Sequence, residues 1–188
     1  MRKYGRMMRK YLAVTLFGTL CLGAGAQQVS IHYSPAENLE TVDLTLLGTT
    51  FKTLDLVLYA FDDKVLADEL VVLAKNGVAI RIYRDQTQYA GEVARGKKGG
   101  PNLNTLLAGY PNVHIKVKGS PALAHLKSYC VDCAGSLPIL RDGSANWSVS
   151  GEKVQDNSLV EVHGGTLPFL FEKNFEALWV RPKNTVVQ

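Results

Sequence analysis

A histidine, a lysine and an asparagine are the residues of this chain that together could do phosphoryl chemistry. His125 and Lys127 are two residues apart, and Asn146 follows Gly143 and Ser144 further along. A neutral imidazole can attack an anionic phosphodiester without charge repulsion, and a neighbouring ammonium can neutralise the non-bridging oxygens. The Asn146 amide can donate to the same oxygens and the Ser144 hydroxyl can assist. Such a site needs no metal ion or other cofactor, and no carboxylate or histidine cluster suited to a cation is evident in the sequence.

The spacing of these residues sets which way they point. His125 and Lys127 lie in residues 124–131, a segment whose pattern predicts a strand. Residues two apart on a strand share a face, so the two side chains should point the same way. Asp132 comes seven residues after His125 and should face the opposite side if the strand stays regular. We therefore expect Asp132 to be structural rather than to contact the substrate.

The segment from His125 to Asn146 resembles the signature of the phospholipase D superfamily, in which His-x-Lys-x4-Asp precedes a Gly-Ser-x-Asn element. The order of elements is also similar to that of the small bacterial endonucleases of this superfamily, which carry one signature. The earlier points of similarity are Tyr33-Ser34-Pro35, Lys75-Asn76-Gly77-Val78 and Tyr83-Arg84-Asp85. The similarity covers nearly all of residues 29–181, and it implies a phospholipase D-like fold and phosphodiesterase activity.

The resemblance also implies a role for each matching residue. His125 would be the nucleophile and would form a phosphohistidine that water then hydrolyses, while Lys127, Asn146 and Ser144 would contact the phosphate. An acidic residue downstream would hold the far nitrogen of the imidazole, and Asp156 is the matching residue.

Two further points concern the completeness of this site. Glu152 is the second choice for the residue that orients the imidazole. The leaving oxygen needs a proton from a second imidazole, and the chain has one signature. The resemblance therefore implies a homodimer in which two copies of His125 meet.

One spacing departs from the pattern of the family. By resemblance, Asp132 and Gly143 are both structural residues. Ten residues separate them, about four more than the family usually has. The extra residues should lengthen the turn at 133–138. Turns can grow at little thermodynamic cost, so we expect a change in hairpin geometry rather than in chemistry.

The substrate is less well defined by the sequence than the chemistry. Arg95, Lys97 and Lys98 could follow a nucleic-acid backbone, although such a run is equally typical of a solvated loop. Trp147 could stack on a base, but core packing is the commoner fate of a tryptophan. The small form with one signature, a secretory leader and this basic run favour an endonuclease acting on DNA or RNA. It should be non-specific because no part of the sequence resembles a module that reads a groove.

Two alternatives to a nuclease stay open. One is a phospholipase D-type hydrolase of phospholipid head groups, against which stands the lack of an evident amphipathic helix or interfacial aromatic cluster. The other is a binding module that has lost turnover, against which stands the intact residue set.

The first 26 residues have the pattern of a secretory signal peptide. Five basic residues precede the apolar run 12–22, and Ala24-Gly25-Ala26 suits a signal peptidase that cuts after Ala26. We expect a periplasmic or secreted domain of residues 27–188, with an uncleaved membrane anchor as the alternative. The full chain has 21 Lys and Arg residues against 17 Asp and Glu. Loss of the leader leaves 16 against 17, so net charge gives no support for nucleic-acid binding.

Cys130 and Cys133 remain after this cleavage. In an oxidising compartment they could form a disulfide, or they could be two thiols without a chemical role. The sequence offers no further ligands at suitable spacing for a zinc site.

The remaining pattern alternates strands with helices. Strands are expected at 29–33, 54–61, 78–83, 113–117, 124–131, 137–146 and 158–162, and helices at 37–49, 65–74, 103–108 and 167–179. Residues 85–100 are polar and glycine-rich and are expected to form a loop. The β-α-β run with an apolar strand at 54–61 predicts a single α/β domain, whose mixed and largely parallel sheet is flanked by helices.

Overall fold

The computed structural model describes residues 27–100 and 102–188, and the expected leader lies outside them. The strands are β1 (Gln28–Ser34), β2 (Thr53–Leu58), β3 (Ala79–Arg84), β4 (Val113–Val117), β5 (Lys127–Val131), β6 (Ile139–Gly143), β7 (Asn157–His163) and β8 (Thr185–Val186). The helices are α1 (Leu39–Leu47), α2 (Lys64–Lys75), α3 (Gln86–Lys97), the 3-10 helix η1 (Leu103–Leu107), α4 (Val149–Lys153) and α5 (Leu167–Trp179).

The strands form one mixed sheet in the order β1-β7-β6-β5-β2-β3-β4-β8. Parallel pairing joins β2 to β3 and β3 to β4, as the β-α-β pattern predicts. The other described pairs are antiparallel, so the expectation of a largely parallel sheet is wrong. The seven residues between β5 and β6 are too few for a crossover and so require antiparallel pairing, whereas the connection from β6 to β7 contains α4 and no local signal in it predicts the direction of β7.

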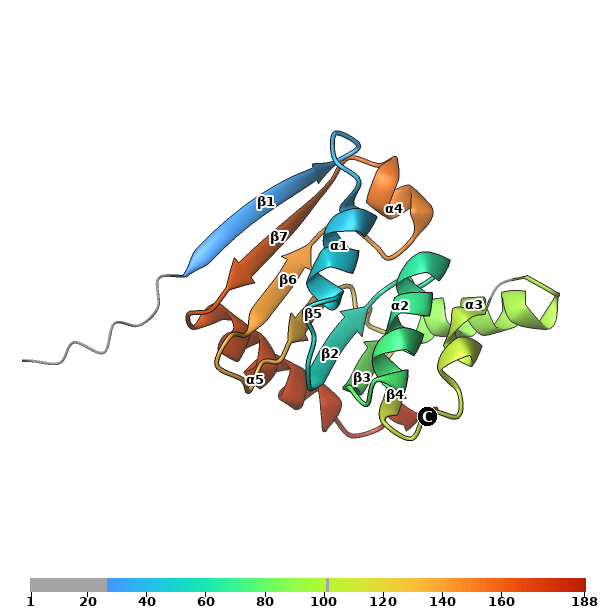
Figure 1. The fold of residues 1–188 in the computed structure, drawn as a ribbon. Helices are drawn as coiled ribbons and strands as arrows, with labels where there is room; N and C mark the ends of the chain where they lie inside the picture. The colour runs from blue at the N-terminus through green and yellow to red at the C-terminus, as the bar shows by residue number, and fades with distance from the viewer. Residues whose placement is uncertain (1–26, 101) are drawn as a thin grey trace, which may run out of the picture.

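Helices cover both faces of this sheet (Figure 1). On one face α1 and α2 pack on a core that includes Leu54, Leu56 and Tyr129. On the other face Val57 and Tyr83 contact Phe175 and the rest of the apolar side of α5. The fold is therefore a single α/β domain with a sheet between helical layers, as expected.

Short polar side chains set where several helices begin. The Asp63 carboxylate accepts hydrogen bonds from the backbone amides of Val65 and Leu66 at the start of α2. Asp85 does the same for Thr87 and Gln88 and so starts α3.

The helix α3 corrects the expectation of a loop at residues 85–100. Its surface is mostly polar, and Glu92 is its one buried residue. The Glu92 carboxylate accepts two hydrogen bonds of 2.7 Å from the buried Arg84 guanidinium. The Asp85 cap and the buried ion pair between Arg84 and Glu92 therefore position α3. The helix was not predicted because it lacks the apolar stripe that usually identifies a helix in a sequence.

Candidate active site

The residues predicted to carry out the chemistry lie at one end of the central strands of the sheet. Lys127 opens β5, and β2 and β6, both antiparallel to it, end beside that point. Ser144 directly follows β6, and its backbone amide bonds to the carbonyl oxygen of Ser158 near the start of β7. A strand was expected at residues 124–131, but β5 begins at Lys127, so His125 lies just before the strand. The site is therefore built from strand ends and loops on a rigid sheet.

His125 and Lys127 are in direct contact. The Lys127 Nζ lies 2.9 Å from Nδ1 and 3.1 Å from Nε2 of the imidazole, and it donates to the His125 carbonyl oxygen at 2.8 Å. A neutral imidazole has one ring nitrogen without hydrogen, so the ammonium can donate to only one of the two nitrogens, and the tautomer decides which. The Lys127 side chain is buried while His125 is exposed. Burial lowers the pKa of Lys127, and the positive charge of Arg141 lowers it further.

Tyr59 completes this cluster, and sequence analysis missed it. Its ring centroid lies 4.3 Å from that of His125, and the Lys127 Nζ lies 4.8 Å from the Tyr59 ring centroid. Gln88 of α3 donates to the Tyr59 hydroxyl at 3.1 Å. Tyr59 directly follows β2, and only the strand order places it beside His125. The ring limits the movement of the imidazole and stabilises the ammonium through a cation–π contact.

We expect Tyr59→Ala to lower kcat on a phosphodiester about tenfold with little change in KM, because a looser imidazole is less often in line with phosphorus. Tyr59→Phe keeps the ring and should restore most of the rate. Steady-state kinetics of the two variants checks this. A wild-type rate for Tyr59→Ala, or equal losses in both variants, would contradict a positioning role for the ring.

Asn146 and Ser144 differ in how their side chains are engaged. The Asn146 Oδ1 atom is buried and has no hydrogen-bond partner among the described residues. The Ser144 hydroxyl donates to Asn157 Oδ1 at 2.9 Å and accepts from the Ser158 amide at 3.0 Å. Ser144 therefore joins the end of β6 to the start of β7, and a direct contact with phosphate stays a prediction for both residues.

The structure separates the two candidates for the residue that orients the imidazole. Asp156 is exposed in the turn before β7, and no hydrogen bond or ion pair among residues 27–100 and 102–188 joins it to His125. Glu152 is fully buried, and its Oε1 lies 3.5 Å from the Arg141 guanidinium. Glu152 thus belongs to the interior behind the site, and the role of Asp156 stays a prediction.

A buried polar network supports the site from behind. Asp43 of α1 accepts hydrogen bonds from the Tyr129 hydroxyl at 2.8 Å, from the Arg141 guanidinium at 3.0 and 2.9 Å, and from the Trp147 indole at 3.1 Å. Arg141 also donates to the carbonyl oxygen of Lys127 at 2.7 Å. The network therefore fixes the backbone from which the Lys127 ammonium projects.

This network corrects one predicted substrate contact. Trp147 is completely buried and packs against Phe61 and Tyr129, so it cannot stack on a base. Core packing, the alternative stated above, is what the structure shows.

Burial is the main cause, and the negative charge of Asp43 the second, of the raised pKa of Glu152, which is about 8. The native state therefore holds a proton that the unfolded chain releases near the ordinary pKa of glutamic acid. This contribution to stability is complete below the unfolded pKa and is lost as pH rises through about 8. The free energy of unfolding should thus fall between about pH 5 and about pH 8, and Glu152→Gln should flatten that slope.

Urea titrations at several pH values measure this slope. Glu172, whose pKa is raised to about 7 chiefly by burial, contributes in the same direction, so Glu172→Gln serves as the matched variant. An unchanged slope in Glu152→Gln would show that Glu152 is ionised in the native state.

Asp132 and Gly143 lie where backbone geometry is constrained. The Asp132 carboxylate accepts hydrogen bonds of 2.8 to 2.9 Å from the amides of Phe51, Lys52 and Thr53. Gly143 has φ of 154°, and a Cβ atom there would collide with the Ser158 carbonyl oxygen. Both placements are those of residues that support the backbone.

Cys130 and Cys133 are joined by a disulfide in the structure, with their Cα atoms 5.7 Å apart. The bond lies where β5 runs into the long turn.

The basic residues Arg95, Lys97 and Lys98 lie at the exposed end of α3. Arg95 is paired with Asp62 at 3.4 Å, whereas no ion pair is found for Lys97 or Lys98 within the described residues. Because α3 also supplies Gln88 to the Tyr59 hydroxyl, the basic end and the site share one helix. Their contact with a substrate stays a prediction.

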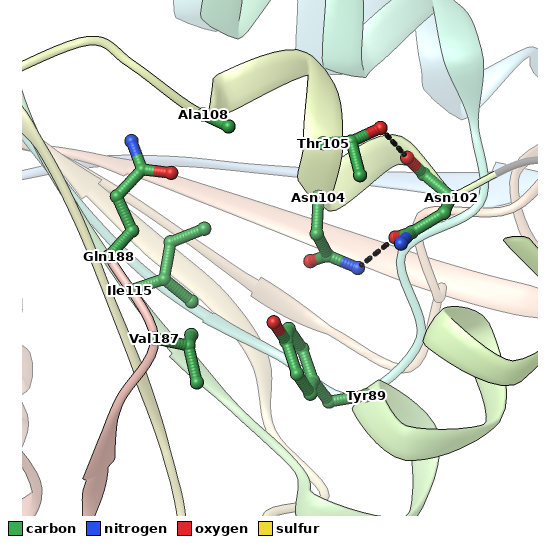
Figure 2. Close-up of a pocket in the computed structure, with 8 residues that line it drawn as sticks. All are labelled: Tyr89, Asn102, Asn104, Thr105, Ala108, Ile115, Val187 and Gln188. Atoms are coloured by element: carbon green, nitrogen blue, oxygen red, sulfur yellow. Dashed lines mark hydrogen bonds between the residues drawn. The ribbon is translucent and has the colours of Figure 1, made fainter. Parts of the chain in front are cut away.

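A cavity of about 130 Å³ lies between α3, η1 and the C-terminus (Figure 2). Tyr89, Ile115 and Gln188 line it, and the polar groups of Asn102 and Asn104 bond to each other there. None of its lining residues is a candidate site residue. No group of three or more His, Cys, Asp or Glu side chains in the described part of the chain is arranged to hold a metal ion.

The imidazole of His125 and the ammonium of Lys127 are in contact at one end of the central strands of a mixed sheet. This is the arrangement of a phosphodiesterase of the phospholipase D superfamily. The family model for the "Cardiolipin synthase, PLD-like domain" matches residues 44–179, and the chain belongs to this family. No curated protein sequence matches the chain significantly.

Solved structures share the fold. A phospholipase D family member, Nuc from Salmonella typhimurium, has a TM-score of 0.71 at 17% identity, over 87% of this chain and 99% of that one. NucT from Helicobacter pylori has a TM-score of 0.68 at 14% identity, over 82% and 96%. Phosphatidylserine synthase from Haemophilus influenzae has a TM-score of 0.63 at 13% identity, over 87% and 40%.

Proposed function

We propose that this phosphodiesterase is an exported, metal-independent endonuclease without strong sequence preference. The contact between His125 and Lys127 carries the proposal, because it presents a neutral nucleophile and a cation to one anionic phosphorus. The similarity of the fold to Nuc over nearly the whole of both chains supports a nuclease of this size. The Lys97 and Lys98 ammonium groups are exposed at the end of α3 and could hold a backbone beyond the scissile bond.

In the proposed reaction a ring nitrogen of His125 attacks phosphorus and the bond to the leaving oxygen breaks. The Lys127 ammonium balances the charge on the non-bridging oxygens, and Asn146 is proposed to donate its amide hydrogens to them. The leaving oxygen takes a proton from a second histidine side chain that starts as an imidazolium and becomes neutral, and we assign it to His125 of the partner subunit in a two-fold dimer. That imidazole then takes a proton from water as the water cleaves the phosphohistidine.

The export of the domain rests on the leader pattern of residues 1–26. A disulfide between Cys130 and Cys133 is consistent with an oxidising compartment. Among the described residues, no helix has the length and apolar character required to cross a bilayer.

A phospholipid head group is the second candidate substrate. The description of the matched family and the fold shared with phosphatidylserine synthase favour it, and the same chemistry would serve.

One assay separates the two substrates. Residues 27–188 and the His125→Ala variant are incubated with plasmid DNA, with RNA and with phosphatidylcholine vesicles, all in excess EDTA. We expect the wild type to cut nucleic acid and the variant to be inactive. Release of choline with intact nucleic acid would establish the lipid substrate, and sedimentation velocity of the same sample tests the dimer.

A further inference from the structure

Exposed apolar side chains gather at the end of the sheet opposite to His125. Three segments form this end, which we call the apolar pole: residues 48–52, 133–138 and 163–170. The Gly164 amide donates to the Pro138 carbonyl oxygen at 2.9 Å, and the Cys133 Sγ lies 3.3 Å from the Pro168 carbonyl oxygen. Together with the bonds from Asp132 to the amides of residues 51–53, these contacts bring all three segments to one place.

The side chains at the apolar pole are large and open to solvent. Phe51 is 84% exposed, Leu137 is 82% exposed and Phe169 is 64% exposed. Phe51 and Leu137 border a hollow of about 910 Å³, which Pro138 and Gly164 also line. Sequence analysis finds no interfacial aromatic cluster because these residues are far apart in the chain, and only the fold assembles them.

The three segments of the apolar pole carry basic but no acidic side chains. They contain no Asp or Glu, and Lys52 is exposed among them. Asp132 also lines the hollow, and its carboxylate accepts hydrogen bonds from three backbone amides. Aromatic and leucine side chains beside an exposed lysine are suited to an anionic lipid surface.

The extra residues of the turn at 133–138 contribute directly to this surface. The turn is longer than the family pattern, contains Leu137 and begins at the disulfide between Cys130 and Cys133. Since the turn lies at the far end of β5 and β6 from His125, the added residues serve the apolar pole and not the chemistry.

The entry point of the chain indicates what covers the apolar pole. Gln28 opens β1 and lines the hollow, and β1 begins where β7 ends and α5 starts (Figure 1). The 26 residues before Gln27, with five basic residues and the apolar run 12–22, therefore join the domain at this end. Before cleavage, a membrane that holds the apolar run 12–22 therefore lies close to this end of the domain, because residues 23–26 alone separate the run from Gln27.

We infer that the apolar pole rests on the surface of an anionic lipid bilayer, with Phe51, Leu137 and Phe169 in the interface. The active site then lies about 17 Å away, at the other end of five-residue strands that rise about 3.3 Å per residue, and it faces the aqueous side. If the proposed function holds, this orientation presents His125 to soluble nucleic acid and keeps the lipids of that bilayer out of reach.

Co-sedimentation of residues 27–188 with vesicles of phosphatidylethanolamine and phosphatidylglycerol tests the inference. These residues contain the whole sheet and its three hydrophobic core clusters. The test variant is Phe51→Ser/Leu137→Ser. The matched control is Val65→Ser/Val72→Ser on α2, where the two side chains are 46% and 47% exposed.

We expect the wild type, the control and His125→Ala to bind alike, and the test variant to bind at least about tenfold more weakly. Equal thermal transitions and equal cleavage of DNA in solution would show that the test variant is folded. Absence of vesicle binding by the wild type, or equal binding by the test variant, would overturn the inference. A dimer that only the test variant loses, without vesicle binding, would assign the pole to a second copy of the chain.

The outcome is separable from that of the proposed function. Vesicle binding with no cleavage of nucleic acid by the wild type would refute the nuclease and leave the docking surface in place. Weaker binding by His125→Ala would instead show that lipid enters the active site, and would contradict the proposed orientation.

Discussion

His125→Ala is expected to lower the rate of phosphodiester cleavage by roughly 10³-fold or more, because it removes the nucleophile and leaves only binding and charge stabilisation. The thermal transition should change little, since His125 is exposed and precedes β5. Initial rates on bis(4-nitrophenyl) phosphate in EDTA, together with the melting temperature, measure both effects.

The matched control for this variant is His114→Ala. His114 is an exposed histidine on β4, and no candidate role falls on it. A rate for His125→Ala within about tenfold of the wild type would mean that the reaction does not pass through this imidazole.

Asp43→Ala should destabilise the native state by about 3 to 5 kcal/mol, because it leaves the Arg141 charge buried without its main partner. Both side chains are inaccessible to solvent, and their closest contact is 2.9 Å. Equilibrium unfolding in urea gives the free energy. Because Arg141 also donates to the Lys127 carbonyl oxygen, activity should fall at temperatures where the variant is still folded.

The double replacement Asp43→Leu/Arg141→Met separates charge burial from packing. It removes both charges, so it should recover much of the stability that the single variant loses. A loss below about 1 kcal/mol for Asp43→Ala would contradict the role of the buried pair.

Several parts of the fold follow from local signals. The strand β2 is recognisable as an apolar run. The helix α2 is bounded by Asp63, which caps its start, and by Gly77, which has a positive φ of 86° after its end. The amphipathic spacing of α5 predicts residues 167–179 without error. The pairing of β5 with β6 and β2, in contrast, depends on contacts across the whole sheet, so it could not be predicted from the spacing of nearby residues.

The candidate site was predictable to the extent that its residues are close in sequence. The two-residue spacing of His125 and Lys127 is enough to bring their side chains together, although the strand begins only at Lys127. Tyr59 has no such signal, since it follows a different strand. Core packing is the commoner expectation for a tryptophan and is confirmed for Trp147, but its partners Phe61, Tyr129 and Asp43 come from other elements and could not be predicted from local spacing.

The most direct test of the account is the chemical trapping of the reaction intermediate. Residues 27–188 are mixed with a short oligonucleotide in EDTA, quenched at alkaline pH where phosphohistidine survives, digested and analysed by mass spectrometry. The account predicts an adduct on the peptide that carries His125, consisting of the nucleotide fragment that stays esterified to the attacked phosphorus, and this adduct should be absent from the His125→Ala variant. Multiple-turnover cleavage that never yields an adduct, and that persists in His125→Ala, would contradict it.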